Sequence, residues 1–361
     1  MRRGCAGLCW VLLFIPSESW GYSSHAEYQQ HLFDLTKKTW TTSPCSRCSE
    51  IQLYKKWQNN KILVPGWVLV PVVWQCVVEL IPRRRKGSKD VKMLLDMFNI
   101  LETRNHTFKH ALLMRQSNPN QAISVAKSMG WKGTSSVIFD RDVVVFDTRL
   151  MGLDWQAKGP EKKPFLSSLI SVPLLNSHPS SSYTGVPKRS VFWAGRCHWS
   201  KARKLMHSIL NANKFYNFKD VHACRFKETY KRNAYLDEIK KHTWTMVPRG
   251  SFPAAFLMAE TLHLERLPIY VSHFFSSWKV ECTKCKILTE DEMFQWFPYN
   301  DILNWTKLAL AIHVSELPNL GKRLNETEPR VEEMLQYAKE KSHMFTWEYL
   351  AIYMKQWMEG H

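Results

Sequence analysis

The chain has 361 residues, enough for two domains of ordinary size that each bury a hydrophobic core. A hydrophobic content of 45% and 16 tryptophans exclude a disordered protein. The formal net charge of +18 at pH 7 indicates an anionic partner, and nucleic acid is the first class to weigh.

The N-terminus has the parts of a secretory signal. Met1, Arg2 and Arg3 precede an apolar run over residues 4–15, and small or polar residues follow as far as residue 21. The apolar run is shorter than the ~20 residues that span a bilayer, which favours a cleaved signal peptide over a short signal-anchor at residues 1–21. A chain on the secretory route meets acidic glycans, so the positive charge favours a glycan over nucleic acid.

Residues 22–175 alternate predicted helices and strands, which indicates a Rossmann-like domain. The apolar tract at 62–81 is followed by a basic run, as a membrane span is. Two prolines, Gln75 and Glu79 inside the tract favour a buried strand instead. The later elements predicted in this half are helices at 92–101 and 122–129 and two short strands within 135–146.

An Asp-x-Asp triplet, Asp140-Arg141-Asp142, lies between those two strands. Such a triplet after an apolar strand can hold a divalent metal, and acidic triplets are also common in turns. We interpret this one as a turn without a metal.

Residues 176–189 are rich in Ser, Pro and Gly and are predicted to be an interdomain linker. A strand is predicted next at 191–194, then a turn at Gly195 and a basic amphipathic helix from Lys201 onward.

The most informative segment is a predicted strand, turn, helix and strand. Residues 243–247 read as a buried strand, and a Pro-Arg-Gly turn with Arg249 and Gly250 ends it. Ser251 is the predicted N-cap of the helix, and residues 268–272 form the second strand. Anionic ligands bind such βαβ units at the carboxyl end of the first strand, which is where Arg249 lies.

This segment resembles the C-terminal half of the exostosin family of glycosyltransferases. The Pro-Arg-Gly turn, Pro253, the run at 267–269 and the Leu-Asn-Trp-Thr-Lys run at 303–307 occur in the order and spacing of that family. The Phe-Trp-Ala-Gly-Arg run at 192–196 is similar to the strand that opens the family's donor domain. The resemblance is strong over residues 188–325 and faint before them.

The resemblance implies a GT-B-like α/β fold, in which two Rossmann-like domains face a cleft. The acceptor-side domain would be residues 22–175, which residues 170–173 close with a strand. The nucleotide-sugar-binding domain would be residues 190–325, and C-terminal helices at 326–361 would follow. In this fold the C-terminal helix crosses back to the first domain, and Trp347 and Trp357 are candidates for that contact.

The implied function is transfer of a sugar, with inversion, from a nucleotide diphosphate sugar to a glycan or glycoprotein acceptor. The donor would be UDP-linked, the acceptor acidic, and the place the Golgi lumen or membrane. No cofactor or metal is expected beyond the donor, and pairing with a homologous transferase is compatible with the family. A metal at Asp140 and Asp142 would instead indicate the single-domain GT-A architecture.

The resemblance also implies which residues contact the donor. Arg249 would lie against the diphosphate and Glu260 would face the ribose, jobs that suit a guanidinium and a carboxylate. The implied donor-binding residues are Gly195, Arg196, Arg203, Arg249, Gly250, Ser251 and Glu260. The catalytic base is not identified; the first half offers four candidates among which the spacing does not choose, His106, His110, Asp140 and Asp154.

Three positions depart from the family near the donor site. Ala254, Ala255 and Leu257 stand where family members commonly have a Ser pair and then an Arg. Phosphate-binding hydroxyls and a cation are therefore missing, which motivates an alternative function, that of a non-catalytic glycan-binding or partner protein.

The cysteines and sequons agree with a lumenal protein. The chain has nine cysteines, and removing Cys5 and Cys9 with the signal leaves seven, an odd number. In an oxidising lumen these cysteines are expected to form disulfides rather than a zinc site. Glycosylation is expected at Asn105 and Asn325, whereas the sequon at Asn304 lies in a family motif that is packed.

Overall fold

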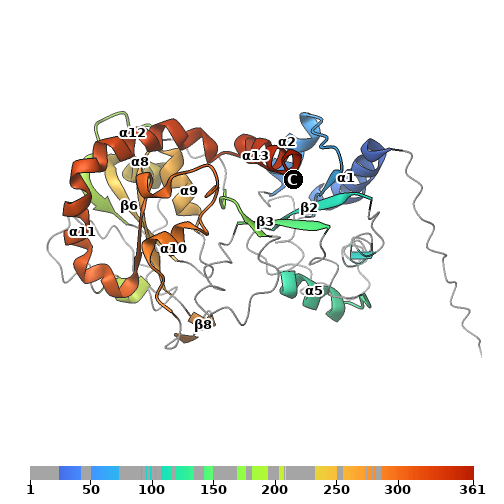
Figure 1. Cartoon of the computed structure of the whole chain (residues 1–361), viewed down its shortest axis with the longest axis horizontal. Coiled ribbons are helices and arrows are strands. Elements are labelled where there is room, and N and C mark those ends of the chain that lie inside the picture. The colour runs from blue at the N-terminus through green and yellow to red at the C-terminus, as the bar shows by residue number, and fades with distance from the viewer. Residues whose placement is uncertain are drawn as a thin grey trace, which may run out of the picture.

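The computed structural model shows a mixed α/β chain with two four-stranded parallel sheets, one in each half of the sequence. Helices cover both sheets, and the two halves lie side by side (Figure 1). The structure describes residues 24–41, 50–72, 107–114, 119–133, 142–148, 169–175, 181–193, 203–206, 232–249, 255–273, 275–277, 280–281 and 286–361, together with residues 91, 95, 98, 99, 102 and 208.

The first sheet has its described strands in chain order, all parallel. The strands are β1 (Trp67–Val70), β2 (Lys109–Met114), β3 (Val143–Asp147) and β4 (Leu169–Ser171). Their near-continuous Val and Leu runs suit a sheet that is covered on both faces. Alternate residues of each strand point to opposite faces, so Val68 and Val145 join one core cluster while Trp67 and Phe146 join the other.

Helices from both ends of the chain cover this sheet. The cluster that contains Val68 packs against α1 (His25–Thr41) and α5 (Pro119–Ser128). The cluster that contains Trp67 packs against α2 (Glu50–Asn59) and α13 (Trp347–Glu359). The C-terminal helix α13 therefore lies beside α2 among N-terminal elements, as Figure 1 shows.

The second sheet has the strand order β10-β7-β6-β5, again all parallel. The strands are β5 (Lys188–Phe192), β6 (His242–Pro248), β7 (Leu267–Ser272) and β10 (Leu310–His313). The named α-helices in the described part of this half, besides α13, are α8 (Arg232–Lys241), α9 (Phe256–His263), α10 (Glu290–Phe294), α11 (Leu320–Thr327) and α12 (Val331–Lys341). A small antiparallel pair, β8 (Phe275–Ser277) and β9 (Val280–Glu281), follows β7.

The contact between the halves is mostly aromatic. Trp357 of α13 meets Trp67 of β1 and Phe146 of β3 edge-on, with ring centroids 5.8 Å and 5.6 Å apart. The backbone N–H of Tyr299 donates to the carbonyl of Ser171, at the end of β4, over 3.3 Å. The predicted contact of Trp357 with the first half is thus observed, and Trp347 is 2% exposed in the same core cluster.

Several predicted elements are observed close to their expected bounds. The strands predicted at 243–247 and 268–272 are β6 and β7, and α9 connects them as the expected βαβ unit. The helix predicted at 122–129 is α5, and residues 170–171 of the predicted closing strand belong to β4.

Three expectations need correction or narrowing. The helix after β6 starts at Phe256 with Ala255 as its N-cap, so the assignment of Ser251 as its cap is wrong. Strand β5 begins at Lys188, because parallel pairing with β6 extends it into the last two residues of the predicted linker. Of the apolar tract at 62–81, the described part forms β1 and its approach, and no described helix has the length and apolar character to cross a membrane.

The docking of α13 predicts a matched pair of stability effects. Trp357→Ala should lower the free energy of unfolding by about 2–4 kcal/mol, because it removes a half-buried ring and two aromatic contacts. Ile352→Ala, on the exposed side of the same helix, should cost about 0.5 kcal/mol or less. Urea unfolding measures both, and equal losses in the two variants would contradict the described docking.

Candidate functional site

The carboxyl edge of the second sheet, meaning residues at and directly after the ends of β6, β7 and β10, gathers three basic side chains. Pro248 pairs in register with Val271, and Ser272 pairs with His313. Arg249 follows β6, His273 follows β7, and His313 is the last residue of β10. Parallel pairing therefore brings Arg249, His273 and His313 to one edge of the sheet, where ligands of open α/β sheets bind.

Arg249 is fixed at this edge by its contacts with β7. Its backbone N–H donates to the carbonyl of Val271, and its Nη1 donates to the carbonyl of His273, each over 3.1 Å. The residue is 5% exposed, so its guanidinium is held in one place rather than ranging over the surface. This placement agrees with the predicted position of Arg249 at the end of the strand.

His273 and His313 are functional candidates that the sequence analysis missed. Their rings are nearly parallel, at an interplanar angle of 21° with centroids 6.0 Å apart. His273 is buried and His313 is half-buried. Each histidine lies at the end of an apolar strand, and this pattern could have marked both as candidates. Nothing in the sequence indicates that the two strands are neighbours in the sheet.

The ring orientation of His313 follows from its role as the N-cap of the 3₁₀ helix Val314–Asn319. Its Nδ1 accepts a hydrogen bond from the backbone N–H of Ser315 over 3.3 Å, and the Ser315 hydroxyl lies 2.7 Å from the same atom. A ring nitrogen that accepts from an N–H carries no proton, so the neutral ring bears its proton on Nε2. His313 is therefore a hydrogen-bond donor at Nε2.

Glu260 lies on α9 but is held by a partner that the sequence analysis did not name. Its Oε1 accepts from Nη2 of Arg232, on α8, over 3.0 Å. The Glu260 side chain is 8% exposed and that of Arg232 is 40% exposed. A nearly buried carboxylate requires such a cation, so this pair has a structural role whatever else Glu260 binds.

Tyr235 lies near this ion pair and near Arg203. Burial raises the pKa of the Tyr235 phenol, and the nearby Glu260 carboxylate raises it further. Burial lowers the pKa of Arg203, and the charge interaction with Tyr235 offsets part of this lowering. The structure thus brings two predicted donor-binding residues, Arg203 and Glu260, to the surroundings of one tyrosine.

Of the candidate bases predicted in the first half, His110 is the one that the structure describes. It is the second residue of β2, at the amino end of that strand, and is fully buried. Its Nε2 lies 3.3 Å from the hydroxyl of Tyr28 on α1. His110 therefore lies at the end of β2 that is opposite to its carboxyl end.

Other predicted residues fall outside the described part of the chain. They are Asn105, His106, Asp140, Asp154, Gly195, Arg196, Gly250, Ser251 and Ala254, together with every cysteine. Of the Asp-x-Asp triplet only Asp142 is described, and its carbonyl accepts from the His110 backbone N–H over 2.6 Å.

The Trp-containing run at 303–307 has a packing role. Trp305 is 3% exposed, its Nε1 donates to the carbonyl of Pro298 over 2.8 Å, and its ring meets that of Phe297 edge-on. Asn304 is exposed and caps the 3₁₀ helix Trp305–Lys307 by accepting from the Thr306 N–H. The expectation that Asn304 is packed is therefore wrong, because its side chain caps a surface turn.

The Asn325 sequon lies on α11. Asn325 is exposed, as a glycosylation site requires, whereas Thr327 is buried and its hydroxyl donates to the Arg323 carbonyl over 2.8 Å. In the folded chain the hydroxyl of Thr327, the third residue of this sequon, is therefore already hydrogen-bonded to the backbone.

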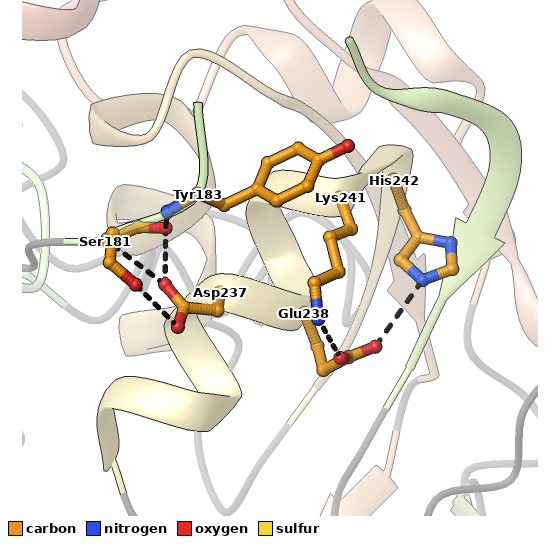
Figure 2. Close-up of polar contacts among 7 residues, drawn as sticks. Ser181, Tyr183, Asp237, Glu238, Lys241 and His242 are labelled. Carbon is orange, nitrogen blue, oxygen red and sulfur yellow. Dashed lines mark hydrogen bonds and ion pairs between the residues drawn. The ribbon is translucent and has the colours of Figure 1, made fainter. Parts of the chain in front are cut away.

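The amino edge of the second sheet carries a second polar cluster, which Figure 2 shows. Ser181 Oγ and the Ser182 N–H donate to Oδ1 of Asp237 on α8, over 2.7 Å and 2.8 Å. These bonds lower the pKa of Asp237, and the hydrogen bond from the Ser181 side chain has the largest effect. The end of the linker is thereby fastened to α8.

His242, the first residue of β6, completes that cluster. Its Nε2 lies 3.7 Å from Oε2 of Glu238, and its Nδ1 lies 2.7 Å from Oγ of Ser190 (Figure 2 shows the Glu238 contact). Lys241 pairs with the other Glu238 oxygen over 2.7 Å. Burial lowers the pKa of His242, and the Glu238 charge offsets this in part.

Comparison with known proteins adds no identification: no protein-family model matches the chain, and no curated protein matches it.

The Arg232–Glu260 pair predicts strong coupling. Arg232→Met should cost about 1–2 kcal/mol, because it leaves the Glu260 carboxylate in a nearly buried site. In the double variant Arg232→Met/Glu260→Gln the carboxylate is gone, so the two losses should fall short of additivity by about 0.5–1.5 kcal/mol. Urea unfolding of the four proteins measures this coupling.

The exposed pair Lys322 and Glu326, 3.9 Å apart, is the control. The cycle through Lys322→Met and Glu326→Gln should show coupling of about 0.5 kcal/mol or less. Equal coupling in both cycles would contradict the structural role of the Arg232–Glu260 pair.

His242 predicts how stability depends on pH. Because its folded-state pKa lies below its ordinary value of 6.5, the unfolded chain takes up this proton first as the pH falls. The stability that the neutral ring contributes is complete above about pH 6.5 and declines below it. His242→Gln should therefore flatten the fall in stability below that pH, measured by thermal unfolding.

The exposed His343→Gln variant serves as the control and should retain the parent's pH dependence. A His242→Gln profile that matches the parent would show that another group determines this fall.

Proposed function

We propose that this chain is an exostosin-type glycosyltransferase with a GT-B arrangement. It takes a nucleotide diphosphate sugar, UDP-linked, and transfers the sugar with inversion to a glycan or glycoprotein acceptor. The observation that carries the proposal is the β6-α9-β7 unit with Arg249 fixed at its carboxyl end. The resemblance of this same segment to the exostosin family supports it independently.

The chemistry of Arg249 fits the departing group. In an inverting transfer the acceptor oxygen bonds to the anomeric carbon as the bond to the diphosphate breaks on the opposite face. Negative charge grows on the diphosphate, and a fixed guanidinium stabilises that charge without having to reorganise. The acceptor proton passes to a base on the opposite side of the cleft.

The arrangement of the halves supports the GT-B interpretation. Each half has its own parallel sheet, and α13 returns from the second half to pack on the first. The end of β4 meets the second half where Tyr299 donates to Ser171. Asp147, at the end of β3, pairs in register with Ser171, so we propose that the acceptor edge lies there and that Asp147 is the base.

One observation favours the alternative, a non-catalytic glycan-binding or partner protein. Ala255 caps α9 with extended backbone and no side-chain hydrogen bond, and Leu257 packs against the core. These two positions therefore supply no phosphate donor from their side chains. Binding of an acidic glycan without binding of any UDP-sugar would support this alternative.

Two further parts of the proposal follow from the N-terminus, the net charge and the family resemblance. The chain would act in the secretory pathway, in the Golgi lumen or on its membrane, on an acidic glycan and not on nucleic acid. Pairing with a homologous transferase is part of the same proposal.

A panel of UDP-sugars tests the function. The parent chain should hydrolyse or transfer at least one of them, and Arg249→Ala should lower kcat/KM by about 100-fold or more, since it removes a charge-stabilising donor. Arg249→Lys should recover only part of this loss, because an ammonium lacks the bidentate geometry.

The exposed Arg330→Ala variant, in the same half, is the control and should keep the parent's activity. The proposal is contradicted if the parent turns over none of the UDP-sugars, and the role of Arg249 is contradicted if Arg249→Ala acts like the parent.

A further inference from the structure

We propose that His273 and His313 donate hydrogen bonds to the donor's diphosphate, and that they do so in place of the hydroxyls missing at the start of α9. The inference rests on the proposed function, because it concerns the same carboxyl edge of the second sheet. It assigns two residues that neither the spacing nor the family resemblance singled out.

The first support is position. His273 and His313 lie at the ends of the adjacent strands β7 and β10, next to Arg249 at the end of β6. Their rings are nearly parallel with centroids 6.0 Å apart, so the two imidazoles lie side by side at this edge. Two imidazoles and a guanidinium at neighbouring strand ends form a row of N–H donors, which is what phosphate oxygens require.

The second support is the protonation state of His313. Because its Nδ1 accepts from the Ser315 N–H, the neutral ring carries its proton on Nε2. The Glu316 carboxylate accepts the His313 backbone N–H over 3.1 Å and belongs to the same cap. The cap fixes the ring orientation, so the N–H of the neutral His313 ring that can donate to an anion is at Nε2.

The third support is rigidity. Arg249 Nη1 donates to the His273 carbonyl, which fixes the backbone at the end of β7. Ser272 Oγ donates to the Ile312 carbonyl over 3.2 Å, which ties that end to β10. The spacing of the two histidines is therefore set before a ligand arrives, and such preorganised donors are the effective ones.

The need for these donors follows from α9 itself. Its N-cap is Ala255, which makes no side-chain hydrogen bond, and Leu257 is used in packing. Among the described residues, the polar side chains at this edge come from the ends of β6, β7 and β10. His273 and His313 follow or end β7 and β10, which lie on the side of β6 opposite to β5. They are therefore placed to donate hydrogen bonds to a diphosphate at this edge.

Calorimetric titration of the full chain with UDP, inorganic pyrophosphate and uridine tests the inference. His273→Gln and His313→Gln should each weaken UDP and pyrophosphate binding about tenfold, the loss expected for a hydrogen bond to a charged group. Neither should alter uridine binding, because uridine has no phosphate. His343→Gln, an exposed histidine of the same half, should bind all three as the parent does.

The outcomes separate this inference from the proposed function. Parent-like affinity for UDP and pyrophosphate in both variants overturns the inference, even if the chain transfers sugar. Histidine-dependent binding in a chain that transfers no sugar upholds the inference and overturns the proposed function. A parent that binds neither UDP nor pyrophosphate overturns both.

A second measurement needs no substitution and so does not depend on how the variants fold. Diethyl pyrocarbonate modifies neutral imidazoles, and mass spectrometry of the parent reports which histidines react. Pyrophosphate should protect His313 and leave His343 unprotected. Equal reaction of His313 with and without pyrophosphate overturns the inference.

Discussion

The parallel pairing of β6 with β7 and of β7 with β10 is the constraint on which the proposed site depends. It sends three strand ends to one edge and so brings together residues that are far apart in the chain: Arg249, His273 and His313. At that edge Arg249 Nη1 donates to the His273 carbonyl, and Ser272 Oγ donates to the Ile312 carbonyl. The three residues are therefore positioned by the pairing of their strands, at an edge where ligands of open α/β sheets bind.

The second constraint is the return of α13 to the first half. Its Trp357 contacts two strands of the first sheet, and Lys56 of α2 pairs with Glu348 over 2.6 Å. One hydrophobic cluster consequently includes residues of both sheets. The packing of α13 on the first half therefore holds the two sheets in a defined relation to each other.

Much of the βαβ unit could be predicted because local patterning determines it: the runs around Thr245 and Ile269 are apolar and β-branched, and a Pro-Arg-Gly turn separates them. The cap at Ser251 was wrong because a good capping residue does not by itself decide where a helix starts. His313 and the partner of Glu260 could not be predicted, since both follow from which strands and helices are neighbours, and that information is non-local.

A crystal structure of the chain with UDP tests the central claim most directly. The diphosphate should lie at the carboxyl edge of the second sheet, with oxygens within hydrogen-bonding distance of the Arg249 guanidinium and the ribose on the α9 side. UDP bound at the first sheet, or bound in the second half away from Arg249, would contradict it.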